Sequence, residues 1–100
     1  MNKLIILPPA AKYIKKIRNK SLKNEFQKAI DEILMNPYIG TLKTGDLAGI
    51  YCYKIYYDKV NYELAYSIVE KNSKIIVILL AGTRENFYEQ LKRYLNTKRQ

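Results

Sequence analysis

The hydrophobic pattern of this chain changes its period at the Asn36-Pro37 pair. In residues 10–33, before the pair, apolar residues recur every three or four positions, which is the spacing of an amphipathic helix. In residues 50–80, after it, apolar residues alternate with polar ones or run continuously, as they do in β-strands. A chain of 100 residues has the size of one domain. The pattern therefore predicts a single α+β domain spanning residues 1–100.

The first part of the chain predicts a short strand followed by a helical hairpin. Residues 3–7 form the strand, and Pro8-Pro9 opens a helix because proline is tolerated at the first helical position. A second helix is expected after a cap at Ser21 and ends at Asn36-Pro37. Its apolar face comprises Leu22, Phe26, Ala29, Ile30 and Ile33.

The second part predicts three antiparallel strands in a meander, at residues 50–57, 62–69 and 74–80. Residues 38–49 hold three of the four glycines and are expected to form a loop. The continuously apolar segment 74–80 is typical of a strand buried on both faces. With the N-terminal strand, the meander would complete a four-stranded sheet.

A C-terminal helix is predicted from about Arg84, with Thr83 as its cap. Its core stripe comprises Phe87, Leu91, Tyr94 and Leu95. The predicted order is thus a short N-terminal strand, a helical hairpin, a three-stranded antiparallel meander and a C-terminal helix.

Charge indicates the class of partner. Eighteen Lys and Arg residues against nine Asp and Glu residues give a net charge of +9, which favours a polyanionic partner. Histidine is absent and Cys52 is the only cysteine, so neither a metal site nor a disulfide framework is expected. No apolar run approaches the roughly 20 residues of a membrane span. We expect a cytoplasmic protein that needs no cofactor.

One face of the predicted meander gathers polar side chains. If Tyr57 pairs with Tyr62, Tyr56 lies opposite Glu63, and Lys54 shares their face. Tyr88 from the last helix is expected to close over this face, with Arg84 at its mouth. The same residues also fit an ordinary surface, on which Lys54 is solvated and Arg84 pairs with a nearby carboxylate.

Three motifs carry a resemblance to a known family. They are Y-K-I at residues 53–55, N-Y-E-L-A-Y at residues 61–66 and G-T-R-E-N-F-Y-E-Q-L-K-R-Y-L at residues 82–95. Together they resemble the RelE/ParE superfamily of toxins from bacterial toxin–antitoxin modules. The loop Gly45–Gly49 is similar to the one that YoeB-type members carry. The resemblance implies a RelE-like, microbial RNase-like fold.

Two activities occur in this superfamily. Most RelE-like members are ribosome-dependent endoribonucleases that cut mRNA and inhibit translation, whereas ParE-like members poison DNA gyrase. A shared fold does not decide between them, and a degenerate, non-toxic member that only binds its antitoxin is a third alternative. In each case the resemblance implies a cognate antitoxin, expected to be a flexible, acidic segment that folds on binding. The ribosome and mRNA, or alternatively gyrase, would be the targets.

The resemblance also implies roles for individual residues. Lys54, Arg84 and Tyr88 match the basic strand position, the arginine after the last strand and the tyrosine of the last helix. Tyr56 and Glu63 depart from the pattern, because many members carry a basic residue at each position. In metal-independent cleavage by the 2′-OH, Arg84 would hold the phosphate and Lys54 would stabilise the transition state.

The remaining assignments complete the expected RNA site. Tyr88 would donate a proton to the leaving oxygen or stack on a base, Glu63 would be an alternative general base, and Tyr56 would line the site. The basic residues of the first helical segment would attract ribosomal RNA, namely Lys12, Lys15, Lys16 and Arg18.

Overall fold

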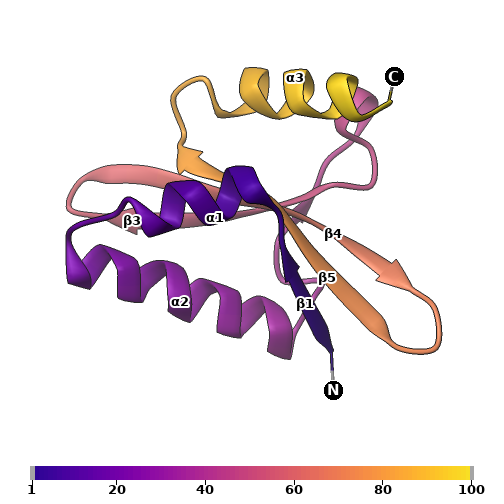
Figure 1. The fold of residues 1–100 in the computed structure, drawn as a ribbon, viewed down its shortest axis with the longest axis horizontal. Helices are drawn as coiled ribbons and strands as arrows, with labels where there is room; N and C mark the ends of the chain where they lie inside the picture. The colour runs from indigo at the N-terminus through magenta and orange to yellow at the C-terminus, as the bar shows by residue number, and fades with distance from the viewer. Residues whose placement is uncertain (1, 100) are drawn as a thin grey trace.

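The computed structural model describes residues 2–99, and side chains are described for residues 2–97. Its elements follow the predicted order (Figure 1). They are β1 (Lys3–Ile6), α1 (Pro8–Lys15), α2 (Lys20–Met35), β2 (Thr41–Leu42), the 3-10 helix η1 (Gly45–Leu47), β3 (Tyr51–Tyr57), β4 (Val60–Glu70), β5 (Lys74–Thr83) and α3 (Phe87–Arg99). The predicted α+β class is confirmed.

The sheet has five strands in the order β1-β5-β4-β3-β2, not the four that we predicted. β1 runs parallel to β5, and the other neighbours are antiparallel. The additional strand is β2, in which Thr41 pairs with Cys52 and Leu42 with Tyr51. Two residues are too few to show an alternating pattern, so the sequence indicated only a loop there.

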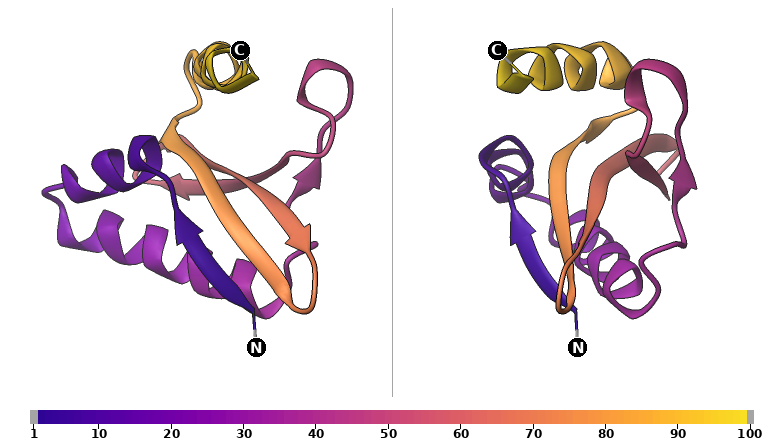
Figure 2. Two further views of the ribbon diagram at one scale, coloured as in Figure 1. Left: turned by 45° about the vertical axis from the view of Figure 1, so that its right-hand side comes forward. Right: turned by 90° about the vertical axis from the view of Figure 1, so that its right-hand side faces the viewer.

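Helices cover both faces of the sheet, with α1 and α2 on one side and α3 on the other (Figure 2). The α1–α2 side holds the larger core, which includes Phe26, Ile33, Ile55, Leu64, Tyr66, Ile76 and Ile78. The α3 side holds a second core of Leu47, Ile50, Cys52, Ala65, Leu79, Leu80, Phe87 and Leu91. β4 and β5 contribute to both cores, which confirms the prediction that the segment 74–80 is buried on both faces.

The helical hairpin agrees with the prediction except for its cap. All five predicted apolar residues of α2 are buried. Its N-cap is Asn19 rather than Ser21, because the Asn19 Oδ1 accepts a 3.1 Å hydrogen bond from the Leu22 N–H. Asparagine is as good a cap as serine, so the sequence allowed both positions.

The register of β3 against β4 differs from the predicted one by two residues. A two-residue turn at Asp58 and Lys59, with φ of 48° and 65°, pairs Tyr57 with Val60. Lys54 therefore lies opposite Glu63, and Tyr56 lies opposite Asn61. Because the shift is even, Lys54, Tyr56 and Glu63 still share one face, as predicted.

A β-bulge interrupts the pairing of β4 with β5. Ala65 pairs with Leu80 while Tyr66 pairs with Ile78, so Leu79 is an extra residue on β5. Leu79 and Leu80 consequently both pack on the α3 side. Beyond the bulge, Gly82 lies opposite Glu63.

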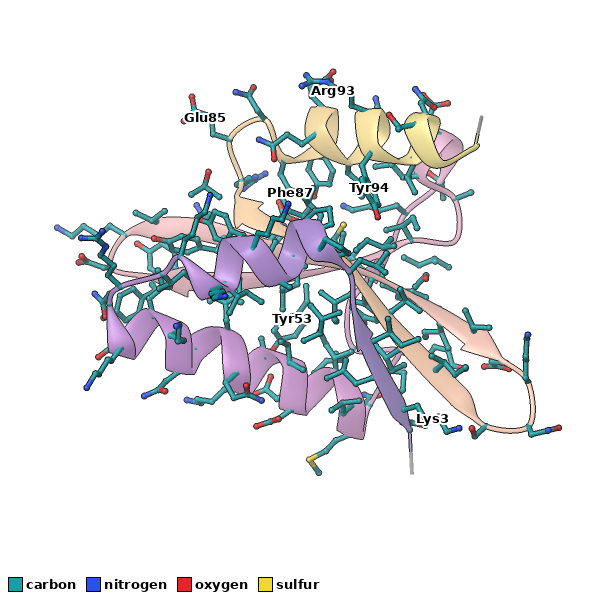
Figure 3. All side chains as sticks on the ribbon, in the orientation of Figure 1. Lys3, Tyr53, Glu85, Phe87, Arg93 and Tyr94 are labelled. Carbon is teal, nitrogen blue, oxygen red and sulfur yellow. The ribbon has the colours of Figure 1, made fainter. Side chains whose placement is uncertain are left out.

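The last helix begins later than predicted. Thr83 is still in β5 and is not a helix cap, and Asn86 has a φ of 61° that keeps it out of a right-handed helix. α3 therefore begins at Phe87. Figure 3 shows Phe87 pointing from α3 toward the sheet and Arg93 pointing away from it.

Candidate functional site

Two adjacent rows of residues cross β3, β4 and β5 at the end of the sheet near the start of α3. One row contains Lys54, Glu63 and Gly82. The next contains Tyr56, Asn61 and Arg84, because the Arg84 N–H donates a 2.8 Å hydrogen bond to the Asn61 carbonyl. Residues directly opposite one another share a face of the sheet. The structure thus brings four predicted site residues, Lys54, Tyr56, Glu63 and Arg84, together on the α3 face.

Three of these residues are accessible to a ligand. The side chains of Lys54, Tyr56 and Arg84 are exposed, and 66% of Tyr56 is accessible. Among the described side chains the only salt bridge joins Lys28 to Glu25 on α2. Neither Lys54 nor Arg84 is therefore neutralised by a carboxylate within the described residues. This end of the sheet carries two exposed positive charges with a tyrosine beside them.

Glu63 lies beneath this surface. Its exposed fraction is 0%, and its Oε1 accepts a 2.9 Å hydrogen bond from the Tyr88 hydroxyl. Its Oε2 has no hydrogen-bond partner among the described residues. Burial, and then the bond to Glu63, raise the pKa of Tyr88, so this hydroxyl keeps its proton. The structure brings Glu63 and Tyr88 together, but it does not expose Glu63.

Two further residues at this site were not predicted. The Lys43 Nζ lies 5.0 Å from the centre of the Tyr88 ring. Its interaction with Tyr88 raises the pKa of Lys43. Cys52 is buried nearby, and burial, followed by the charge of Glu63, raises its pKa to about 11.

Strand alternation could have placed Cys52 here, because Cys52 shares the face of Lys54. No comparable signal existed for Lys43, which lies in the loop after β2. The loop is held next to the start of β3 by the 2.8 Å hydrogen bond from the Lys43 N–H to the carbonyl of Ile50, the residue before the strand.

The basic residues of the α1 segment separate into two pairs. All four, Lys12, Lys15, Lys16 and Arg18, are exposed. Lys16 and Arg18 line a pocket together with Tyr62 and Thr83. Lys12 and Lys15 are not among the residues that line it. Of these four residues, the structure therefore places only Lys16 and Arg18 beside the end of β5, which Arg84 directly follows.

Within residues 2–99, no three Cys, Asp or Glu side chains are grouped so that they could hold a metal ion. In the same part of the chain, no helix has both the length and the apolar composition needed to cross a membrane.

Comparison with known proteins gives a family and a fold. Residues 4–92 match the family model of the ParE-like toxin of type II bacterial toxin–antitoxin systems. No curated protein sequence matches the chain significantly.

Solved structures of E. coli RelE are similar to this fold. A RelE mutant in the free state aligns with a TM-score of 0.66 and 21% identity over 91% of this chain and 95% of that chain. RelE in the intact RelBE toxin–antitoxin complex aligns with a TM-score of 0.62 and 22% identity over 80% of this chain and 93% of that chain.

Proposed function

This chain belongs to the ParE-like toxins of type II bacterial toxin–antitoxin systems, and we propose that it is a ribosome-dependent mRNA endoribonuclease. The observation that supports this activity best is the exposure of Lys54, Tyr56 and Arg84 in two adjacent rows of the sheet. Two cations and a phenol on one surface suit an RNA phosphate with its neighbouring base.

Arg84 and Lys54 have different roles toward the reacting phosphate. The guanidinium of Arg84 presents paired N–H donors that fit two phosphate oxygens at once. The ammonium of Lys54 is a compact charge suited to the negative charge that develops in the transition state. Because neither forms a salt bridge within the described residues, no carboxylate has to be displaced before the phosphate binds.

The proposed reaction is internal attack by the ribose 2′-OH. The 2′ oxygen forms a bond to phosphorus while the bond from phosphorus to the 5′ oxygen breaks. The products are a 2′,3′-cyclic phosphate and a 5′-OH. One proton leaves the 2′-OH and one reaches the 5′ oxygen. Since the chain has no histidine, lysine, tyrosine or glutamate side chains or groups of the ribosome must move these protons.

Glu63 is better suited to positioning than to proton abstraction. A side chain with 0% exposure cannot contact a 2′-OH while Tyr88 lies against it. We therefore assign Glu63 the role of orienting the Tyr88 hydroxyl. The Tyr88 hydroxyl donates to Glu63, and the Lys43 Nζ lies over one face of the Tyr88 ring. A base can therefore stack only on the face of the ring that Lys43 leaves open.

A cognate antitoxin is part of this proposal. E. coli RelE has been solved in complex with a peptide of its antitoxin. For this chain, the net charge of +9 fits an acidic, flexible antitoxin segment.

The decisive test is cleavage of a defined mRNA by the purified chain with and without ribosomes. We expect cleavage only with ribosomes, and fragments that end in a cyclic phosphate and begin with a 5′-OH. Arg84→Ala should reduce cleavage by about a hundredfold or more, as for loss of one charge-stabilising donor. Arg93→Ala is the matched control, because Arg93 points away from the sheet (Figure 3). Full cleavage by the Arg84 variant would refute the assignment.

Poisoning of DNA gyrase is the second candidate, and one observation favours it. At Glu63, where many RelE-like members have arginine, this chain buries a carboxylate, which removes positive charge from the proposed nuclease face. A gyrase poison needs no acid–base groups. Gyrase-dependent DNA breaks in the presence of the purified chain, with mRNA left intact on ribosomes, would favour this alternative.

A further inference from the structure

A pocket of about 360 Å³ lies where the α1–α2 connection meets the ends of β4 and β5. Its lining includes Tyr13, Lys16, Arg18, Tyr62 and Thr83. Its volume is in the range of roughly 300–1,000 Å³ that small ligands occupy. We infer that this pocket binds one nucleotide of the substrate RNA, next to the phosphate held at Arg84. The inference rests on the proposed endoribonuclease function.

The rings in the pocket suit a nucleobase. Phe26, whose exposed fraction is 0%, holds Tyr13 at a centroid distance of 6.1 Å and Tyr62 at 5.7 Å. Both tyrosines are half-buried, so each is fixed on one side and accessible on the other. Ile17 and Leu22 add apolar surface to the lining. A base that enters between these groups gains stacking and apolar contact together.

The charges in the pocket suit a phosphate. Lys16 and Arg18 are both exposed, and no carboxylate is among the lining residues. Neither cation forms a salt bridge within the described part of the chain. A nucleotide uses both features of the pocket, the rings for its base and the cations for its phosphate. A peptide would need one acidic and one apolar side chain to use both features, whereas a single nucleotide carries both groups, and we therefore favour RNA.

The pocket lies on the α1–α2 face of the sheet, opposite the proposed cleavage site, and the two are neighbours at the end of β5. Two pocket residues, Tyr62 and Thr83, pair with each other across β4 and β5. Each is next in the chain to a residue of the proposed cleavage site, Tyr62 to Asn61 and Thr83 to Arg84. Figure 1 shows the α1–α2 connection, the β3–β4 turn and the end of β5 at the same end of the molecule. A strand bound at Arg84 can therefore continue around the end of the sheet into the pocket.

The first test measures binding of a labelled single-stranded RNA of about eight nucleotides, a length within the range of known single-strand sites. The double variant Lys16→Ala/Arg18→Ala is compared with Lys12→Ala/Lys15→Ala, which removes equal charge from exposed residues outside the pocket. We expect the first to weaken binding about tenfold more than the second. Equal weakening would overturn the inference, because it would indicate attraction by net charge alone.

The second test asks whether the pocket recognises a base. An oligonucleotide of the same length with abasic sugars retains every phosphate and should bind about tenfold more weakly. Tyr13→Leu should weaken binding of the ordinary RNA but not of the abasic RNA, whereas Tyr13→Phe, which keeps the ring, should bind like the parent. If the parent chain binds both oligonucleotides equally, the inference is wrong.

Cross-linking on the ribosome identifies the source of the nucleotide. With 4-thiouridine beside the cleaved bond of the mRNA, we expect the cross-link on Tyr13 or Tyr62. A cross-link from the pocket to ribosomal RNA instead of mRNA would overturn the assignment to the substrate strand. The assignment would also be wrong if the pocket residues were shielded from labelling by an acidic antitoxin peptide but not by RNA. The proposed cleavage is tested separately with Arg84→Ala. The proposal for the pocket and the proposal for the activity can therefore be refuted independently of each other.

Discussion

The Tyr88 hydroxyl at the start of α3 donates a 2.9 Å hydrogen bond to the buried Oε1 of Glu63 in β4. This bond joins the last helix to the sheet across the α3-side core. The other oxygen, Oε2, has no hydrogen-bond partner among the described residues. Glu63 is thus a buried carboxyl group with one side-chain hydrogen bond among the described residues, the one from Tyr88.

Tyr88→Phe should destabilise the chain because it leaves Glu63 buried without this partner. Leaving a buried hydrogen-bond acceptor without its partner costs about 1–3 kcal/mol of unfolding free energy, measurable by urea denaturation. In a Glu63→Leu background the same substitution should cost about 1 kcal/mol or less, because no buried acceptor is left unsatisfied. Equal costs in the two backgrounds would mean that the bond contributes no coupling energy.

Lys54→Gln should lower mRNA cleavage on ribosomes at least about tenfold without changing thermal stability. The exposed Lys54 lies in no salt bridge within the described residues, so its removal disrupts no internal contact, while it takes away a charge that stabilises the transition state. Lys71→Gln is a control of equal charge, since Lys71 lies in the exposed β4–β5 turn at the other end of the sheet. A parallel loss in both variants would contradict a specific role for Lys54.

Cys52 should be inert in the folded chain. Its pKa is raised from 9.0 to about 11, so its thiolate fraction at about pH 8 is roughly a hundredfold lower than in the unfolded chain. A colorimetric thiol reagent should react slowly until urea unfolds the protein. Rapid modification under native conditions would show that the thiol is not buried as described.

The same shift predicts a pH dependence of stability. The folded chain keeps the Cys52 proton to higher pH than the unfolded chain does. The associated stability is therefore present below the unfolded pKa near 9 and is lost as the pH rises toward about 11. Urea denaturation of the parent chain and of Cys52→Ala across this range should show a shallower decline for the variant.

Gly40→Ala should destabilise the chain by roughly 1–3 kcal/mol. A Cβ atom at Gly40 would lie 2.7 Å from the Tyr66 hydroxyl oxygen, which accepts a 2.9 Å hydrogen bond from the Gly40 N–H. Gly82→Ala is the control, because its nearest contact would be an ordinary 3.6 Å to Phe87. Urea denaturation that ranks the two variants in the opposite order would contradict this account of Gly40.

Lys59→Gly should stabilise the chain by about 0.5–1 kcal/mol in thermal unfolding. Lys59 has a φ of 65° in the two-residue β3–β4 turn, where glycine carries no steric penalty. Lys71→Gly, in the β4–β5 turn at a residue without positive φ, should give no such gain. Destabilisation of the Lys59 variant would contradict the turn geometry.

Local patterns in the sequence determined most of the fold. The spacing of Leu22, Phe26, Ala29, Ile30 and Ile33 identified the buried face of α2, and alternation identified the shared face of Lys54 and Tyr56. These predictions hold because each depends only on the period of a helix or a strand. β2 was missed because two residues show no period, and Lys43 because loops follow no period at all.

The side of the sheet that Arg84 occupies was decided by the tertiary structure. Simple alternation along β5 from Ile76 and Ile78, which pack against α2, would have placed Arg84 on the α1–α2 face. The bulge at Leu79 reverses the alternation, so Gly82 lies opposite Glu63 and Arg84 opposite Asn61. Sequence alone determined that an arginine ends the apolar strand. Only the packing of Leu79 and Leu80 together beneath α3 placed it on the face of Lys54 and Tyr88, because a bulge in a continuously apolar strand leaves no trace in the hydrophobic pattern.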